Sequence, residues 1–309
     1  MSKEVEEKLL NIPVINIIVR VFRRIILPGF NGLSLYDLLE IYITGIIKGT
    51  FSSRASSIAY SFFIAIFPFL LFILNLISYI KVEGFQQRFL TFIEELLPPQ
   101  THDFFYPVIE DIAINQRTGL TYFVLFLSLF LAANGVNAIF SAFEGSYLVK
   151  INRAFFKQFF ISIAVAICLS VLMLVTIGVI LYGEYIISEL KGSDFISDDI
   201  FWINVFQVVV FVGMVYVIIA GLYHFGVKKG RHTRFFSIGA LMTTLLFLLT
   251  TYLFGIYINN FSNYNELYGS IGALMIMLFY IWINSNLLLL GFELNISLQR
   301  LKEKQQPEE

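Results

Sequence analysis

Six long runs without a charged residue follow one another along the chain, separated by polar and charged segments. They are Ala55–Ile80, Gly119–Phe143, Phe159–Tyr182, Phe201–Phe225, Phe235–Ile258 and Leu267–Phe292. Each run exceeds the about 20 residues that a helix needs to cross the hydrocarbon core. Backbone groups in lipid must pair within their own segment, and the runs lack the period-2 alternation of barrel strands. The pattern therefore predicts an all-α, polytopic membrane protein with six transmembrane helices.

The composition agrees with this fold class. Only 14% of the 309 residues are Asp, Glu, Lys or Arg, whereas a soluble domain usually carries about 25%. The net charge of −1 gives no indication of a nucleic-acid partner, and none is expected. Cys168 is the one cysteine, so neither a disulfide within the chain nor a cysteine-built metal site can form.

Lys and Arg alternate in abundance from one connection to the next. Seventeen of the 21 fall in the N-terminal segment, in the second-to-third and fourth-to-fifth connections, and in the tail, whereas four fall in the remaining connections. Basic residues collect on the cytoplasmic side of membrane proteins. The distribution supports the six spans of a multi-pass membrane protein and predicts that both termini are cytoplasmic.

Three segments are expected outside the spans. Residues 1–54 form a cytoplasmic segment with amphipathic helices, of which PVINIIVRVFRRIILP at 13–28 carries three arginines and is typical of a helix lying on anionic lipid. Residues 81–118, broken by Pro98-Pro99, predict an extracytoplasmic helical hairpin. Residues 55–296 form the transmembrane domain with this hairpin, and residues 297–309 form a cytoplasmic tail.

Polar residues recur at a spacing of seven near the ends of two spans. Asn286 and Glu293 are seven residues apart, as are Asn137 and Glu144. Seven residues make about two helical turns, so each pair shares one helix face. Arg54 enters the first span at the same membrane level, so Arg54, Arg300 or the loop after the second span lies within reach of Glu293.

Two interpretations of these residues stay open. In the first, Glu293 is an interfacial carboxylate that orients helices through an ion pair. In the second, polar side chains line the inner mouth of a cleft that receives a polar head group or couples transport to protons. The candidate cleft residues are Arg54, Asn134, Asn137, Glu144, Asn284, Asn286 and Glu293, with Ser285 beside them.

Catalytic constellations are not found in the sequence. The three histidines are scattered, and no H-E-x-x-H, P-loop or G-x-S-x-G pattern occurs. We therefore expect no metal site, no cofactor and no enzymatic activity. Ser57, Ser61 and Ala65, four residues apart, predict a close-packing face in the first span.

Two stretches resemble the YihY/BrkB family of bacterial inner-membrane proteins. They are ASSIAYSFFIAIFPFLLF at 55–72 and YINNFSNYNELYGSIGALMIMLFYIWINSNLLLLGFELN at 257–295. The family pattern falls on Tyr257, Tyr268, Gly269, Ser270, Gly291, Glu293, Leu294 and Asn295. The resemblance implies six helices with cytoplasmic termini. The family also carries a historical ribonuclease label. The sequence argues against this label, because it contains no metal-binding His/Asp cluster and no basic segment that would form a groove for RNA.

Three functions are compared on this basis. The first is a transporter or flippase for a lipid or other amphiphile, which the polar cleft residues and amphipathic flanks favour. The second is a non-catalytic scaffold of cell-envelope assembly, in which the glutamates only pair. An intramembrane enzyme ranks third. Membrane lipids are the expected partners, and a homo-oligomer or envelope-protein partners are left open.

Overall fold

The structure is a computed structural model of the whole chain. It describes residues 50–77, 84–96, 121–146, 154–192, 199–226, 235–261 and 270–305, together with the single residues 22, 24, 34, 36, 106, 107 and 110. The predicted amphipathic helices of segment 1–54 and the second helix of the 81–118 hairpin lie almost entirely outside them.

Seven α-helices account for the described ranges. They are α4 (Thr50–Ile77), α5 (Phe85–Leu96), α7 (Thr121–Glu144), α8 (Phe155–Gly192), α9 (Asp199–Gly226), α10 (Ile238–Phe261) and α12 (Ser270–Gln305). Within this part of the chain, six helices are long and apolar enough to cross a membrane. The six predicted spans are confirmed as helices, and α5 confirms the first helix of the predicted hairpin.

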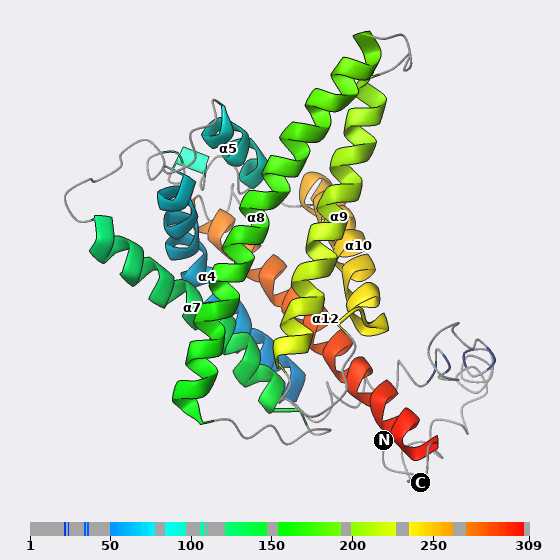
Figure 1. Cartoon of the computed structure of the whole chain (residues 1–309). Helices are drawn as coiled ribbons and strands as arrows, with labels where there is room; N and C mark the ends of the chain where they lie inside the picture. Colours follow the sequence, from blue (N-terminus) through cyan, green and yellow to red (C-terminus); the bar gives the residue numbers. More distant parts are fainter. Residues whose placement is uncertain are drawn as a thin grey trace.

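Two helices run well beyond their apolar cores. α8 continues past Tyr182 to Gly192, and α12 continues past Phe292 to Gln305. At 38 residues, α8 is about 57 Å long, more than the about 30 Å of the hydrocarbon core. A charged residue ends the apolar run without ending the helix, because outside the lipid a helix surface can be polar. Figure 1 shows α8 and α9 side by side, with their far ends projecting beyond the other helices.

The six spans form a ring in chain order. α4 packs against α7, α7 against α8, α8 against α9, α9 against α10, α10 against α12, and α12 closes the ring against α4. α5 packs on α8 and α4 at one end. The start of α4 and the end of α12 lie at the opposite end (Figure 1), which the sequence predicts to be the cytoplasmic side; we call it the basic end.

The interior divides into two apolar clusters. One lies toward the basic end and contains Phe51, Phe140, Phe143 and Phe292. The other lies toward the α5 end, where apolar residues of α5 such as Phe89 join those of α4, α8, α9 and α12. The strong amphipathic pattern of α5 is explained by this contact, because its apolar face joins this cluster.

Small residues bring α4 and α7 together. A Cβ atom added at Gly135 would lie 2.7 Å from the Cβ of Ala65 and within 4 Å of the backbone of Ser61 and Phe62. Close helix approach of this kind is a main source of packing energy in membranes, where the hydrophobic effect no longer drives helix association. The predicted packing face on the first span is confirmed at Ser61 and Ala65.

The α4–α7 contact gives a stability prediction. Gly135→Ala should lower the free energy of unfolding by about 1–3 kcal/mol, because the new methyl group overpacks the contact. Adding Ala65→Gly in the same chain should restore most of the loss by removing the opposing methyl. Thermal unfolding in detergent measures both.

Gly213→Ala is the matched control, because Gly213 also lies inside a helix and a Cβ there meets nothing within 4 Å. Its unfolding temperature should stay the same or rise, since Ala is the better helix former. Equal effects of the alanines at 135 and 213 would contradict the packing account.

Candidate functional site

Glu293 of α12 is fully buried and has partners on two sides. Its exposed fraction is 0%. Oε1 accepts a hydrogen bond from Nη1 of Arg54 at 3.1 Å, and Oε2 accepts one from Oγ of Ser146 at 2.6 Å. Ser146 lies just beyond the end of α7, so this carboxylate connects α12 to α4 and to the end of α7.

Arg54 extends the same connection. Its Nε donates to the carbonyl oxygen of Ala142 on α7 at 2.7 Å, and its side chain is 10% exposed. Its Nη2 is buried and has no hydrogen-bond partner within the described residues. Removing two charges from water costs several kcal/mol per ion, and only close pairing with further hydrogen bonds compensates this cost. The guanidinium is therefore held in place by Glu293 and Ala142, while one buried donor group has no partner among the described residues.

Aromatic rings pack beside this ion pair. Phe143 and Phe292 stack with ring centroids 4.0 Å apart and planes 4° apart. Tyr223 of α9 lies against both rings. Phe292 directly precedes Glu293 and Phe143 directly precedes Glu144, so the repeated Phe-Glu dipeptide places the stack next to the ion pair. The rings make this side of the ion pair apolar, and a low local dielectric strengthens an electrostatic interaction.

Residues on either side of Glu293 anchor α12 to α9 and α10. A Cβ atom at Gly291 would collide with Oγ1 of Thr243 and lie 2.5 Å from the hydroxyl of Tyr223. The Tyr223 hydroxyl donates to the carbonyl of Leu288 at 2.7 Å. The side chain of Asn295 accepts from the backbone N–H of Gly239 at 2.9 Å, at the start of α10.

The segment GFELN at 291–295 therefore connects α12 to four other helices at this end of the bundle. Gly291 allows the close approach of α9 and α10, Glu293 connects α4 and α7, Leu294 is fully buried, and Asn295 satisfies an N–H at the start of α10. Free N–H groups at a helix start need such acceptors. These contacts give each of the four residues a structural role at this end of the bundle.

One outward face of α7 changes from apolar to polar toward the basic end. Along this face, at the three-and-four spacing of a helix, lie the exposed or half-buried residues Leu127, Phe130, Asn134, Asn137 and Ser141. The last three form a polar stripe at the level of the ion pair. Ser141 directly precedes Ala142, whose carbonyl binds Arg54, so the stripe and the ion pair lie at one membrane level.

Gln158 of α8 binds two members of this stripe. Its Nε2 donates to Oδ1 of Asn137 at 3.2 Å and to Oγ of Ser141 at 3.0 Å. Gln158 is itself buried. The polar stripe is thus a positioned set of side chains rather than a scatter of single residues. We refer to Asn134, Asn137, Ser141 and Gln158 as the α7–α8 polar face.

The structure brings some of the predicted cleft residues together and separates others. Arg54 contacts Glu293, as predicted, and Glu144 lies half-buried at the end of α7. Asn284 and Asn286 donate to carbonyls four residues earlier in α12. Asn284 lies nine residues before Glu293, which places it on the opposite side of α12. The side chain of Arg300 falls outside the described part.

Sequence reasoning missed several polar residues that complete the site. Ser146 and Gln158 lie outside the charge-free runs; the loop after the second span is predicted to reach Glu293, but neither residue is singled out. Tyr223 and Thr243 lie inside runs, where the sequence assigns neither of them a role in the site. Both lie near the basic ends of their spans, Tyr223 in the fourth and Thr243 in the fifth. This shared level could have indicated that they face each other, once the two helices are known to be neighbours. Of the remaining family positions, Tyr257 is exposed on α10, Ser270 begins α12, and Tyr268 and Gly269 lie outside the described residues.

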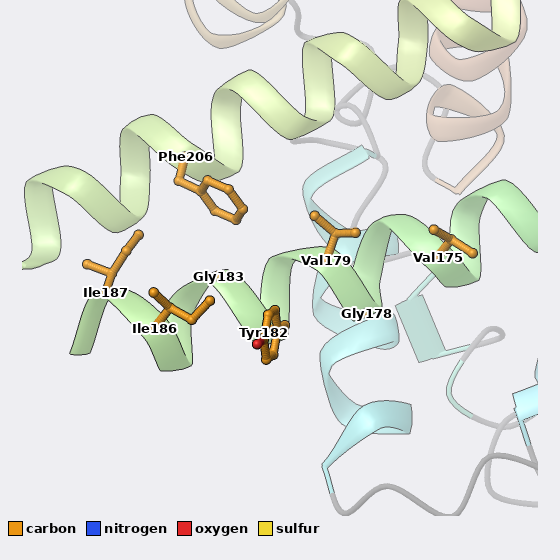
Figure 2. A pocket seen from close by; sticks show the side chains of 8 residues that line it. All are labelled: Val175, Gly178, Val179, Tyr182, Gly183, Ile186, Ile187 and Phe206. Carbon is orange, nitrogen blue, oxygen red and sulfur yellow. The ribbon is translucent and has the colours of Figure 1, made fainter. Parts of the chain in front are cut away.

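Two cavities lie elsewhere, at the far ends of α8 and α9. The larger, about 530 Å³, is lined by Val175, Gly178, Val179, Tyr182, Gly183, Ile186, Ile187 and Phe206. In Figure 2 the Phe206 ring points toward α8 at Gly183. Apart from one tyrosine hydroxyl its lining is apolar, so it provides a hydrocarbon surface and no reactive group. No group of three His, Cys, Asp or Glu side chains in the described ranges could hold a metal ion.

A closed ring of six apolar helices with an ion pair buried among them defines a polytopic α-helical membrane protein. The sequence matches the family described as "Virulence factor BrkB" over residues 43–309. The chain belongs to this family, as the resemblance at 55–72 and 257–295 indicates.

Individual relatives agree with this assignment. The chain is 28% identical over 254 residues to YfkH of Bacillus subtilis, whose name describes it as ribonuclease-like; the match covers 81% of this chain and 91% of YfkH. A UPF0761 membrane protein of Psychrobacter is 24% identical, over 85% of this chain and 48% of that longer protein. A UPF0761 membrane protein of Coxiella burnetii is 22% identical over 77% of this chain and 84% of its own length. No solved structure matches the fold significantly.

The ion pair yields a stability prediction. Glu293→Ala should lower the free energy of unfolding by about 3–5 kcal/mol, because it leaves Arg54 buried without a counter-charge. Arg54→Ala should be similarly costly. The double substitution should cost clearly less than the sum of both, since neither charge is then left alone. Chemical unfolding in detergent measures this double-mutant cycle.

Glu189→Ala provides the control for the ion-pair cycle, because Glu189 is an exposed carboxylate on α8 and its loss should stay within about 0.5 kcal/mol. Strict additivity of the two alanine substitutions would show that Arg54 and Glu293 do not interact energetically.

Proposed function

We propose that this membrane protein moves a lipid or other amphiphile, receiving the polar head group at the basic end of the bundle. The observation that carries the proposal is the buried guanidinium of Arg54, which has one donor group without a partner in the described residues beside the α7–α8 polar face. Ionisable residues within membrane spans are costly and commonly mark a transport pathway.

Arg54 and the α7–α8 polar face bind different parts of the head group in this proposal. A phosphate or carboxylate accepts hydrogen bonds from a guanidinium well, because the planar fork of Arg offers parallel N–H groups. Asn134, Asn137 and Ser141 supply neutral donors and acceptors to the remaining head-group atoms. The exposed apolar part of the same face, Leu127 and Phe130, continues toward the bilayer centre and suits an acyl chain.

Glu293 has a positioning role in this proposal. Because it is fully buried and both oxygens have partners, it does not itself bind a head group. It holds the guanidinium and neutralises it while the site is empty. Nη2 of Arg54 is also buried, so a head group reaches it only when α4 and α7 move apart. A transporter whose bundle opens alternately to the two sides of the membrane makes a movement of this kind in each cycle.

The protein is taken to act without enzymatic chemistry in the bacterial inner membrane. The absence of catalytic motifs in the sequence supports the first point, and the bacterial relatives named as membrane proteins support the second. A scaffold in envelope assembly is the second candidate. It is favoured by one observation, the completeness with which Glu293 is paired, because an ion pair that only joins helices needs nothing further.

Lipid translocation in proteoliposomes tests the proposal. A fluorescent phospholipid is followed by its loss to a membrane-impermeant quencher. The native chain should give flux above empty liposomes. The double variant Arg54→Gln/Glu293→Gln removes both charges but keeps side chains that can hydrogen-bond, and its flux should fall at least about tenfold, the size expected for losing one charged hydrogen bond.

Glu189→Gln serves as the control and should keep native flux. Native flux in the uncharged double variant would retain transport but reduce the ion pair to a helix anchor. Flux no higher than in empty liposomes for the native chain would overturn the transport proposal and favour the scaffold.

A further inference from the structure

A second polar cluster lies at the opposite end of the bundle, where α5, α8 and α9 meet. Nη2 of Arg88 donates to Oε2 of Glu184 at 2.8 Å, and Nε2 of Gln207 donates to Oε1 of the same carboxylate at 2.7 Å. The side chain of Arg88 is 42% exposed and that of Glu184 is 17% exposed. One carboxylate thus ties together three helices at the polar edge of the apolar bundle.

A cavity of about 220 Å³ opens directly beside this cluster. Its lining consists of Arg88, Thr91, Phe92, Ile177, Ile180, Gln207, Val208 and Phe211. The polar members come from α5 and from one position of α9, while the apolar members extend toward the membrane core. A site that encloses a whole drug-sized ligand measures about 300–1,000 Å³, so this cavity takes a segment of a chain and leaves the rest of the ligand outside.

The order of these groups along the membrane normal matches that of an amphiphile. Glu184 follows the end of the apolar run at Tyr182, so the charged cluster marks the boundary between hydrocarbon and water. Ile177 and Ile180 lie one to two turns deeper on α8. A head group at the cluster therefore places its hydrocarbon chain in the cavity below.

The charges of the cluster select the kind of head group. Within the described residues, Nε and Nη1 of Arg88 have no hydrogen-bond partner and are directed to no carboxylate. They can donate to a phosphate. Glu184 stands next to this position and repels an additional net negative charge. Each of its oxygens accepts one hydrogen bond, and because the side chain is partly exposed, a further lone pair can accept from an ammonium group. A neutral Arg–Glu pair is complementary to a head group that carries both charges.

We infer that this cavity is a binding site for a zwitterionic phospholipid of the outer leaflet. The phosphate binds Arg88, the ammonium group binds Glu184, and the start of an acyl chain enters between Phe92, Ile180 and Val208. The inference does not rest on transport, because a lipid held here stabilises the contact of α5 with α8 and α9 whether or not the chain moves lipid.

Binding of a short-chain phospholipid to the purified full chain in detergent tests the site. Native mass spectrometry counts bound dioctanoyl phosphatidylethanolamine, and dioctanoyl phosphatidylglycerol is compared at the same concentrations. We expect one saturable site for the zwitterionic lipid and about tenfold weaker binding of the anionic one. Arg88→Gln should weaken binding of the zwitterionic lipid by about tenfold, because a charge-assisted hydrogen bond is lost.

A matched pair of tryptophan substitutions separates the cavity from the fold. Val208 and Val209 are neighbours on α9 and are 60% and 64% exposed, but only Val208 lines the cavity. Val208→Trp should block binding and Val209→Trp should leave it unchanged, with equal unfolding temperatures. Chain-free glycerophosphoethanolamine should fail to compete, because it leaves the cavity empty.

Equal binding by the two tryptophan variants, or the lack of any saturable site, would overturn the assignment of the cavity. Equal affinity for phosphatidylglycerol would overturn the zwitterionic head group. Competition by glycerophosphoethanolamine at the lipid's own concentration would show that the head group alone is recognised.

Discussion

The ion pair between Arg54 and Glu293 is the interaction on which the arrangement of the basic end depends. A carboxylate with no exposed surface is stable there only because a guanidinium and the Ser146 hydroxyl complete its hydrogen bonds. The same pair fixes α4 against α12 and, through the Ala142 carbonyl, against α7. The ring of helices is closed between α4 and α12, so the ion pair joins the first span to the last, which are far apart in the chain.

The GFELN segment shows how one short stretch can satisfy several helices at once. Its glycine admits the side chains of α9 and α10, its glutamate reaches α4 and the end of α7, and its asparagine binds the start of α10. In lipid these contacts rely on small residues and completed hydrogen bonds rather than on water exclusion. The site and the packing are therefore inseparable, and a substitution here changes both stability and any transport that depends on Arg54.

Much of the fold could be predicted from the sequence because the bilayer imposes a single length and polarity on each span. Six helices follow from run lengths, and residues at one membrane level place Arg54 among the predicted partners of Glu293. The ends of α8 and α12 could not be predicted, because a helix that leaves the lipid gives no hydropathy signal. The partners Ser146, Gln158 and Tyr223 could not be predicted either, since hydrogen bonds between helices depend on rotations about their axes that seven-residue spacing does not determine. The N-terminal amphipathic helices, the cytoplasmic position of both termini and the domain boundaries stay predictions.

The central claim is that the α7–α8 polar face is reached by water at the basic end while the same helix face deeper in the bilayer is not. Thiol labelling tests it directly in a Cys168→Ser background, with single cysteines placed at Asn137, Ser141 and Leu127 and an exposed reference at Lys157, near the start of α8 at the basic end. The account predicts that a charged, membrane-impermeant reagent labels positions 137 and 141 from the basic side and leaves 127 unlabelled. Protection of 137 and 141 together with labelling at 157 would contradict it, since the polar face would then be sealed in lipid or protein.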